Sequence, residues 1–93
     1  MYARIATFEG ATADIKAAMQ QATADGPPEG LKSSEAYFFA DTASGKSIFV
    51  TFFDSEDDMK AGDAILNAMS PSDVGIGQRA SVDLMEVVAH MTV

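Results

Sequence analysis

Three side chains of this 93-residue sequence could carry out chemistry on a small molecule, namely Arg4, Tyr37 and His90. His90 is the only histidine, so its imidazole could act as a general base but could not form a histidine-rich zinc site within one chain. The phenol of Tyr37 could orient a substrate or donate a proton. Arg4 lies in a predicted central strand, where a charge is costly unless it is paired or faces a pocket, so it could anchor an anionic ligand.

Each candidate also has a structural interpretation. His90 can be a strand residue at the rim of a dimer, and Tyr37 can place its ring in the core and its hydroxyl near solvent. Arg4 can form an ion pair at a strand end with an acid of the last predicted strand, such as Glu86 or Asp83. The sequence leaves both interpretations open for all three residues.

The sequence contains no motif for a cofactor, a metal or a nucleophile. It has no cysteine, which excludes thiolate metal sites, disulfides and cysteine nucleophiles. The acidic run at 54–58 lacks the glycine and terminal glutamate of an EF-hand loop and is typical of a helix start. We therefore expect no cofactor and no metal. An enzyme of this sequence would have to orient a reactive substrate in an apolar pocket.

Composition describes one small acidic domain over residues 1–93. The net charge is −8 and the six Lys and Arg residues are scattered singly, so we expect no nucleic-acid partner and no binding to an anionic membrane. No apolar run approaches 18 residues, and the N-terminus lacks the apolar stretch of a signal peptide, which predicts a cytoplasmic protein. Area scaling gives a folded surface of about 5,200 Å² for a 9.8 kDa chain.

Hydrophobic spacing predicts strand, helix, strand, strand, helix and strand in that order. The first helix follows a predicted N-cap at Thr12 and ends at Gly26, and the second begins after an N-cap at Ser55 and ends before Pro71. The strands are expected over 1–8, 35–41, 47–53 and 78–93.

This order predicts an α+β fold of the ferredoxin-like βαββαβ type, with a four-stranded antiparallel sheet and the first and third strands in its centre. Both helices then cover one face of the sheet. The third strand nevertheless carries Phe49 and Phe53 on one face and Ile48, Val50 and Phe52 on the other. A second apolar face needs a cover, so we expect a homodimer with sheet against sheet. The last segment is longer than a typical strand, and we expect it to bend or to reach onto the partner.

Four segments carry a family resemblance: Phe8-Glu9-Gly10, Pro27-Pro28-Glu29-Gly30, Phe52-Phe53-Asp54-Ser55-Glu56 and residues 81–88. Through them nearly the whole chain resembles the dimeric α/β-barrel superfamily, and within it the antibiotic-biosynthesis-monooxygenase-like domains. The resemblance implies two protomers that form a barrel and a pocket between sheet and helices in each protomer. Similar proteins include cofactor-independent monooxygenases that act on phenolic or quinol substrates.

Two features depart from the catalytic members. Tryptophan is absent, although haem-degrading relatives rely on one, and Arg4-Ile5-Ala6-Thr7 stands where some active relatives carry asparagine. The resemblance implies a cofactor-independent monooxygenase-like protein that acts on or binds a small aromatic or phenolic molecule. The alternative is a non-catalytic dimeric ligand-binding or assembly module of the same fold. Whether the protein is an enzyme stays open.

Overall fold

The computed structural model describes residues 1–10, 15–26, 28–41, 43–68 and 78–92, with only the backbone at 15, 18 and 22. The predicted helix N-cap at Thr12 and the predicted helix end at Pro71 lie outside the described residues. The elements follow the predicted order: β1 (Tyr2–Glu9), α1 (Ile15–Asp25), β2 (Glu35–Asp41), β3 (Lys46–Phe53), α2 (Glu56–Asn67) and β4 (Gln78–Glu86). None of the described helices is long and apolar enough to cross a membrane.

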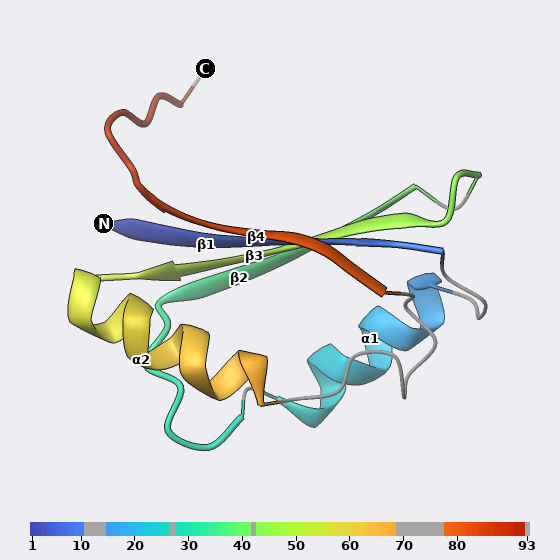
Figure 1. The fold of residues 1–93 in the computed structure, drawn as a ribbon, viewed down its shortest axis with the longest axis horizontal. Helices are drawn as coiled ribbons and strands as arrows, with labels where there is room; N and C mark the ends of the chain where they lie inside the picture. The colour runs from blue at the N-terminus through green and yellow to red at the C-terminus, as the bar shows by residue number, and fades with distance from the viewer. Residues whose placement is uncertain (11–14, 27, 42, 69–77, 93) are drawn as a thin grey trace.

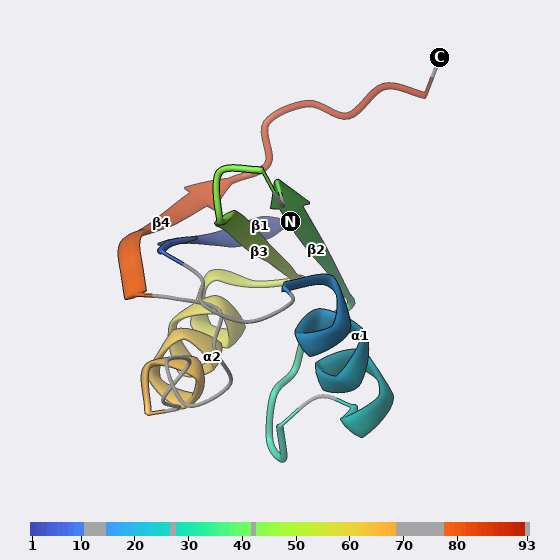
Figure 2. The ribbon, with the colours of Figure 1, turned by 90° about the vertical axis from the view of Figure 1, so that its right-hand side faces the viewer.

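The four strands form one antiparallel sheet in the order β2-β3-β1-β4, so β1 and β3 are central. Both helices lie on the same side of this sheet (Figures 1 and 2). The chain is therefore an α+β structure of two layers, and the core lies between the sheet and the helices. We call the two sides of the sheet the helix-covered face and the open face.

The helix-covered face holds the buried side chains. Phe53 is fully buried beneath α2, and the rings of Phe38 and Phe49 stack 4.4 Å apart on neighbouring strands. The other buried apolar residues of the core include Ala6, Phe8, Met19, Met59 and Leu66. Alternation along the strands places the neighbours of these sheet residues on the open face.

Local capping explains where α2 begins and where α1 ends. The Ser55 hydroxyl accepts a hydrogen bond from the Asp58 N–H at 3.1 Å, which confirms Ser55 as the N-cap of α2. Gly26 follows α1 with φ +81° and donates its N–H to the Thr23 carbonyl. This left-handed conformation is one that a glycine adopts without strain, so Gly26 ends the helix as predicted.

The open face carries large apolar side chains that nothing in the described chain covers. Tyr37, Phe39 and Met85 are 50%, 53% and 51% exposed. The chain exposes 6098 Å² in total, about 900 Å² more than the roughly 5,200 Å² expected for a folded protein of this mass. The single chain therefore buries less surface than a monomer of its size normally does.

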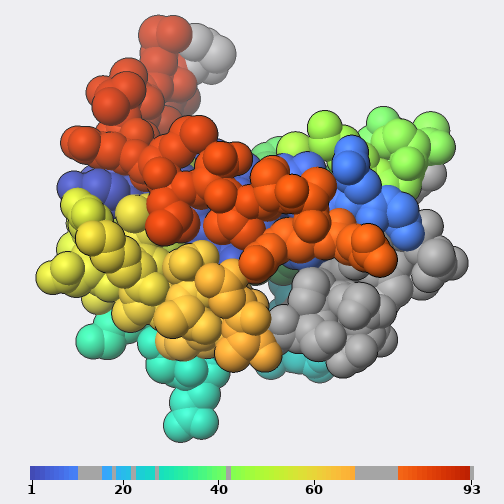
Figure 3. Space-filling model, in the orientation of Figure 1, coloured from blue at the N-terminus to red at the C-terminus, as the bar shows by residue number. Residues whose placement is uncertain are grey.

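The last predicted strand, over 78–93, is too long. β4 ends at Glu86, which is in register with Tyr2, the first residue of β1. The Val87 N–H still donates to the Met1 carbonyl at 2.9 Å. Residues 88–92 then leave the sheet and project from the body of the molecule (Figures 1 and 3). We call residues 87–92 the C-terminal tail.

Close packing of α2 on β3 generates a prediction. A Cβ at Gly62 would lie 2.5 Å from the buried ring of Phe53. We expect Gly62→Ala to lower the free energy of unfolding by about 1–3 kcal/mol, although alanine favours a helix by about 1 kcal/mol. Urea denaturation at fixed protein concentration measures this. The same substitution in a Phe53→Leu background should be tolerated, and a gain in stability with Phe53 present would contradict the packing.

Candidate functional site

The structure does not bring the three candidate catalytic residues together within one chain. Arg4 lies on the helix-covered face of β1, whereas Tyr37 lies on the open face of β2. His90 lies in the C-terminal tail, where its side chain is exposed. The sheet itself separates Arg4 from Tyr37. Within one chain these residues therefore form no catalytic dyad or triad.

Arg4 is part of a polar network between sheet and helix. It is 2% exposed, and its Nε donates to Asp63 Oδ1 at 2.8 Å. Its Nη2 donates to Asn67 Oδ1 at 3.1 Å, and Asn67 Nδ2 donates to Asp63 Oδ2 at 3.2 Å. Arg79 of β4 also donates to Asn67 Oδ1. The guanidinium of Arg4 is thus engaged in a structural bridge from β1 to α2.

The acid that pairs with Arg4 differs from the two expected from the sequence. Asp83 is in register with Ile5, so its side chain lies on the open face, and Glu86 is in register with Tyr2 at the strand end. Asp63 instead comes from α2, four residues before Asn67, and this spacing places both side chains on one face of the helix. The ion-pair interpretation of Arg4 therefore fits the structure, with a partner from a different element.

Tyr37 belongs to an aromatic cluster on the open face. Its ring stacks with Phe39 at 6.3 Å between centroids and meets Phe52 edge-on at 6.0 Å. The ring is thus half exposed on the open face instead of lying in the core beneath the helices. Both geometries are ones that aromatic pairs prefer. The cluster offers apolar surface to whatever covers this face.

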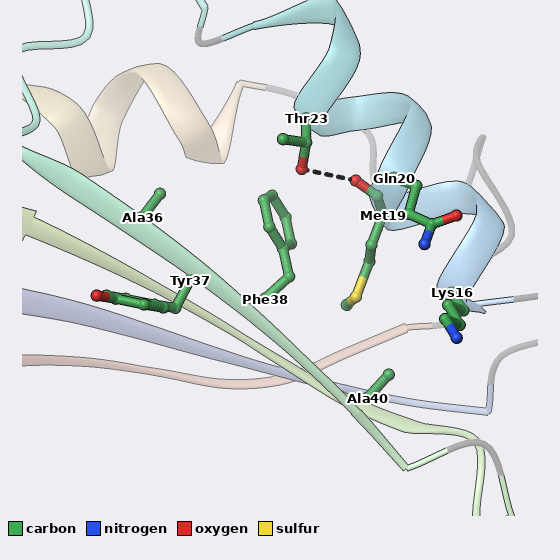
Figure 4. Close-up of a pocket in the computed structure, with 8 residues that line it drawn as sticks. All are labelled: Lys16, Met19, Gln20, Thr23, Ala36, Tyr37, Phe38 and Ala40. Atoms are coloured by element: carbon green, nitrogen blue, oxygen red, sulfur yellow. Dashed lines mark hydrogen bonds between the residues drawn. The ribbon is translucent and has the colours of Figure 1, made fainter.

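A hollow of about 590 Å³ lies between α1 and β2. Figure 4 shows its lining residues, which are Lys16, Met19, Gln20, Thr23, Ala36, Tyr37, Phe38 and Ala40. We call this space the α1–β2 hollow. Its volume lies in the range of small-molecule pockets. Of the three candidate residues, only Tyr37 contributes to it.

The floor of the α1–β2 hollow is apolar and its rim is polar. The side chains of Met19 and Phe38 stand between the helix and the strand, while the ring of Tyr37 points away (Figure 4). The Thr23 hydroxyl donates to the Met19 carbonyl at 2.9 Å. Sequence analysis missed Lys16 and Phe38 as lining residues, because a pocket between a helix and an edge strand leaves no local pattern. The arrangement suits a small apolar ligand and holds no group of three metal ligands among the described residues.

Comparison with known proteins found no relative of this chain. No family model matches the chain, and no curated protein or solved structure matches it either. The resemblance to the dimeric α/β-barrel superfamily therefore stays a prediction. The geometry of the chain alone carries the functional proposals that follow.

The Arg4 network generates a second prediction. We expect Asp63→Asn to lower the free energy of unfolding by about 1–3 kcal/mol, because it leaves a buried guanidinium without its counter-charge. Glu29→Gln is the matched control: it also removes one negative charge, but from an exposed loop position, and should change stability by no more than about 0.5 kcal/mol. Urea denaturation of both variants measures the difference. Equal effects would contradict a structural role for the Arg4–Asp63 pair.

Proposed function

We propose that this chain is a non-catalytic, homodimeric binding module of the ferredoxin-like βαββαβ type. Two copies pair through the open faces of their sheets, as in a dimeric α/β barrel, and each copy binds a small aromatic molecule in the α1–β2 hollow. The observation that carries the proposal is the uncovered apolar surface of the open face. The two parts of the proposal, assembly and ligand binding, are argued separately below.

Assembly rests on the size and chemistry of the open face. The apolar side chains there are Ile5, Tyr37, Phe39, Ile48, Val50, Phe52 and Met85. They come from all four strands, with Met85 as the contribution of β4 beside the polar Asp83 and Ser81. Monomeric proteins rarely expose a large apolar patch.

A second copy of the same chain is the occupant that best fits this face. Two-fold symmetry would bring the open face of one sheet against an identical one, and such self-complementary contacts are the commonest form of oligomer. Sheets that pack face to face in this way lie about 10 Å apart and interdigitate their side chains. The aromatic cluster of Tyr37, Phe39 and Phe52 would then lie inside the interface. The apolar C-terminal tail, with Val88 89% exposed and Met91 79% exposed, supplies further surface for the partner.

Ligand binding rests on the α1–β2 hollow. Met19 and Phe38 give it an apolar floor, and the two alanines of β2, Ala36 and Ala40, leave room above the sheet. Apolar walls with a few polar groups are the usual composition of small-molecule sites. An aromatic ligand fits these walls, because its ring can lie against the Phe38 side chain.

Cofactor-independent monooxygenation is the second proposal, favoured by the contribution of Tyr37 to the hollow. Two observations count against it. Arg4 is held by Asp63 and Asn67 and does not line the hollow, and neither does His90. A substrate in the hollow would contact the backbone of β2 near Tyr37. The phenol ring of Tyr37 points to the opposite face of the sheet. The non-catalytic proposal therefore fits the geometry better.

The assembly proposal predicts the behaviour of a charged variant. Phe39→Glu places a carboxylate on the open face at an already exposed position, so we expect a folded monomer at micromolar concentration in sedimentation velocity. Ala24→Glu is the control, because it adds the same charge at an exposed position of α1. It should sediment as the unaltered protein does. A Phe39→Glu protein that stays dimeric would contradict pairing through this face.

The non-catalytic proposal predicts no oxygen chemistry. With a reduced naphthoquinone as substrate, we expect O₂ uptake in the presence of the protein to equal the uncatalysed rate. An oxygen electrode measures this for the unaltered chain and for Tyr37→Phe and His90→Ala. Protein-dependent uptake that falls about tenfold or more in either variant would support the monooxygenase instead.

A further inference from the structure

β2 is an edge strand, and its outer side has no partner in the described part of the chain. It pairs with β3 alone, because the strands run in the order β2-β3-β1-β4. An edge strand presents backbone N–H and C=O groups that can pair with a further strand. Between Glu35 and Asp41 every residue of β2 is apolar, and Tyr37 and Phe39 are about half exposed. The edge therefore lacks the inner charges and prolines that commonly prevent strand addition.

The opposite edge of the sheet is polar. β4 carries the charged residues Arg79, Asp83 and Glu86 along its length. Charged side chains on an edge strand disfavour pairing with another chain. Of the two edges, β2 is thus the one that suits an added apolar strand.

The C-terminal tail has the composition of such a strand. Residues 87–92 contain no proline and no carboxylate, although the chain has 14 acidic residues. Val88 and Met91 are the most exposed of the large apolar side chains in the described part of the chain, at 89% and 79%. Within that part, no hydrogen bond or ion pair holds residues 88–92. The tail is therefore an apolar segment with free backbone groups.

The direction and length of the tail fit a second copy paired through the open face. In both ribbon views the tail rises from the sheet on the side opposite the helices (Figures 1 and 2). Facing sheets lie about 10 Å apart, and an extended chain rises about 3.3 Å per residue. Roughly three steps from Val87 therefore reach the level of the partner's sheet, which leaves residues 90–92 to pair there. The tail's own β2 is separated from β4 by two strands.

We propose that the C-terminal tail of one copy adds as a strand to the outer edge of β2 in a second copy, with residues 90–92 paired to that edge. Alternation along the added strand places Met91 on one side and His90 and Thr92 on the other. Met91 lies on the side of the aromatic cluster of the open face, because a thioether packs favourably against aromatic rings. This inference rests on the proposed function, since it requires that two copies pair.

A spin label on the tail tests where the tail lies in the partner. The chain has no cysteine, so Thr92→Cys gives a single site for a nitroxide label. This complete chain is mixed with unaltered, isotope-labelled chain, so that paramagnetic broadening of amide signals reports only on the partner of the labelled copy. We expect the largest loss of amide signal at residues 35–41 of β2 and a small loss at residues 78–86 of β4.

The same label at Ala24→Cys is the control, because this exposed position of α1 lies on the side of the sheet away from the partner. It should broaden none of the β2 signals of the isotope-labelled copy. With Thr92→Cys, the largest loss at β4, an equal loss over all four strands or no loss would each overturn the inference.

Deletion of residues 88–93 tests how much the tail contributes to pairing. Strand addition supplies main-chain hydrogen bonds, so we expect the dissociation constant of the dimer to rise about tenfold or more in sedimentation equilibrium. The amides of β2 should also exchange faster with solvent. Met91→Leu is the matched control, because it keeps an apolar side chain and the backbone N–H, and it should change the dissociation constant by no more than about twofold.

The outcomes separate this inference from the proposed function. A dimer that pairs through the open face with the same dissociation constant after the deletion overturns the strand addition and leaves the dimer in place. A complete chain that sediments as a monomer overturns both. Weaker pairing after the deletion with no change in the exchange of the β2 amides also contradicts the inference, because the tail would then act at another surface.

Discussion

Two helices on one side of a four-stranded sheet cannot cover its other side, and this constraint governs the rest of the structure. Both helices cover the face that holds Phe8, Phe49 and Phe53. The open face is nonetheless built from aromatic and branched side chains, with Tyr37 and Phe39 about half exposed. Because burial of apolar surface is the main favourable term in folding, a face of this kind is stable in water only with a cover. The proposed pairing of two copies would provide that cover without any further element.

The two helices are held in different ways, and the difference creates the hollow. α2 lies over the central strands, where Gly62 allows close contact with Phe53 and Asp63 holds the buried Arg4. α1 contacts the edge strand β2 instead. A helix packed on an edge strand shares less surface with the sheet, which leaves space between Met19, Phe38 and the alanines of β2. The binding proposal follows from this unequal packing.

Much of the fold is readable from local sequence, and most of the site is not. The strand at 35–41, the N-cap at Ser55 and the end of α1 at Gly26 depend on neighbouring residues and agree with the structure. The end of β4 depends on where its partner strand begins, so the prediction that it continues to residue 93 is wrong.

Long-range pairing explains why the site residues were harder to predict. The acid beside Arg4 comes from a helix 59 positions later, and spacing alone does not reveal it. Lys16 and Phe38 line one hollow from a helix and a strand that the topology brings together. His90 and Tyr37 were candidate catalytic residues because of their residue types. The structure places both of them apart from Arg4. Residue type without placement is thus weak grounds for a catalytic site.

The most direct test of the central claim is isotope-filtered NMR on a mixture of labelled and unlabelled chains. Pairing through the open face predicts intermolecular NOEs from Tyr37, Phe39 and Met85. It predicts none from Phe38 or Phe53, which lie on the helix-covered face. Intermolecular NOEs confined to the helices, or their complete absence at millimolar concentration, would contradict the account.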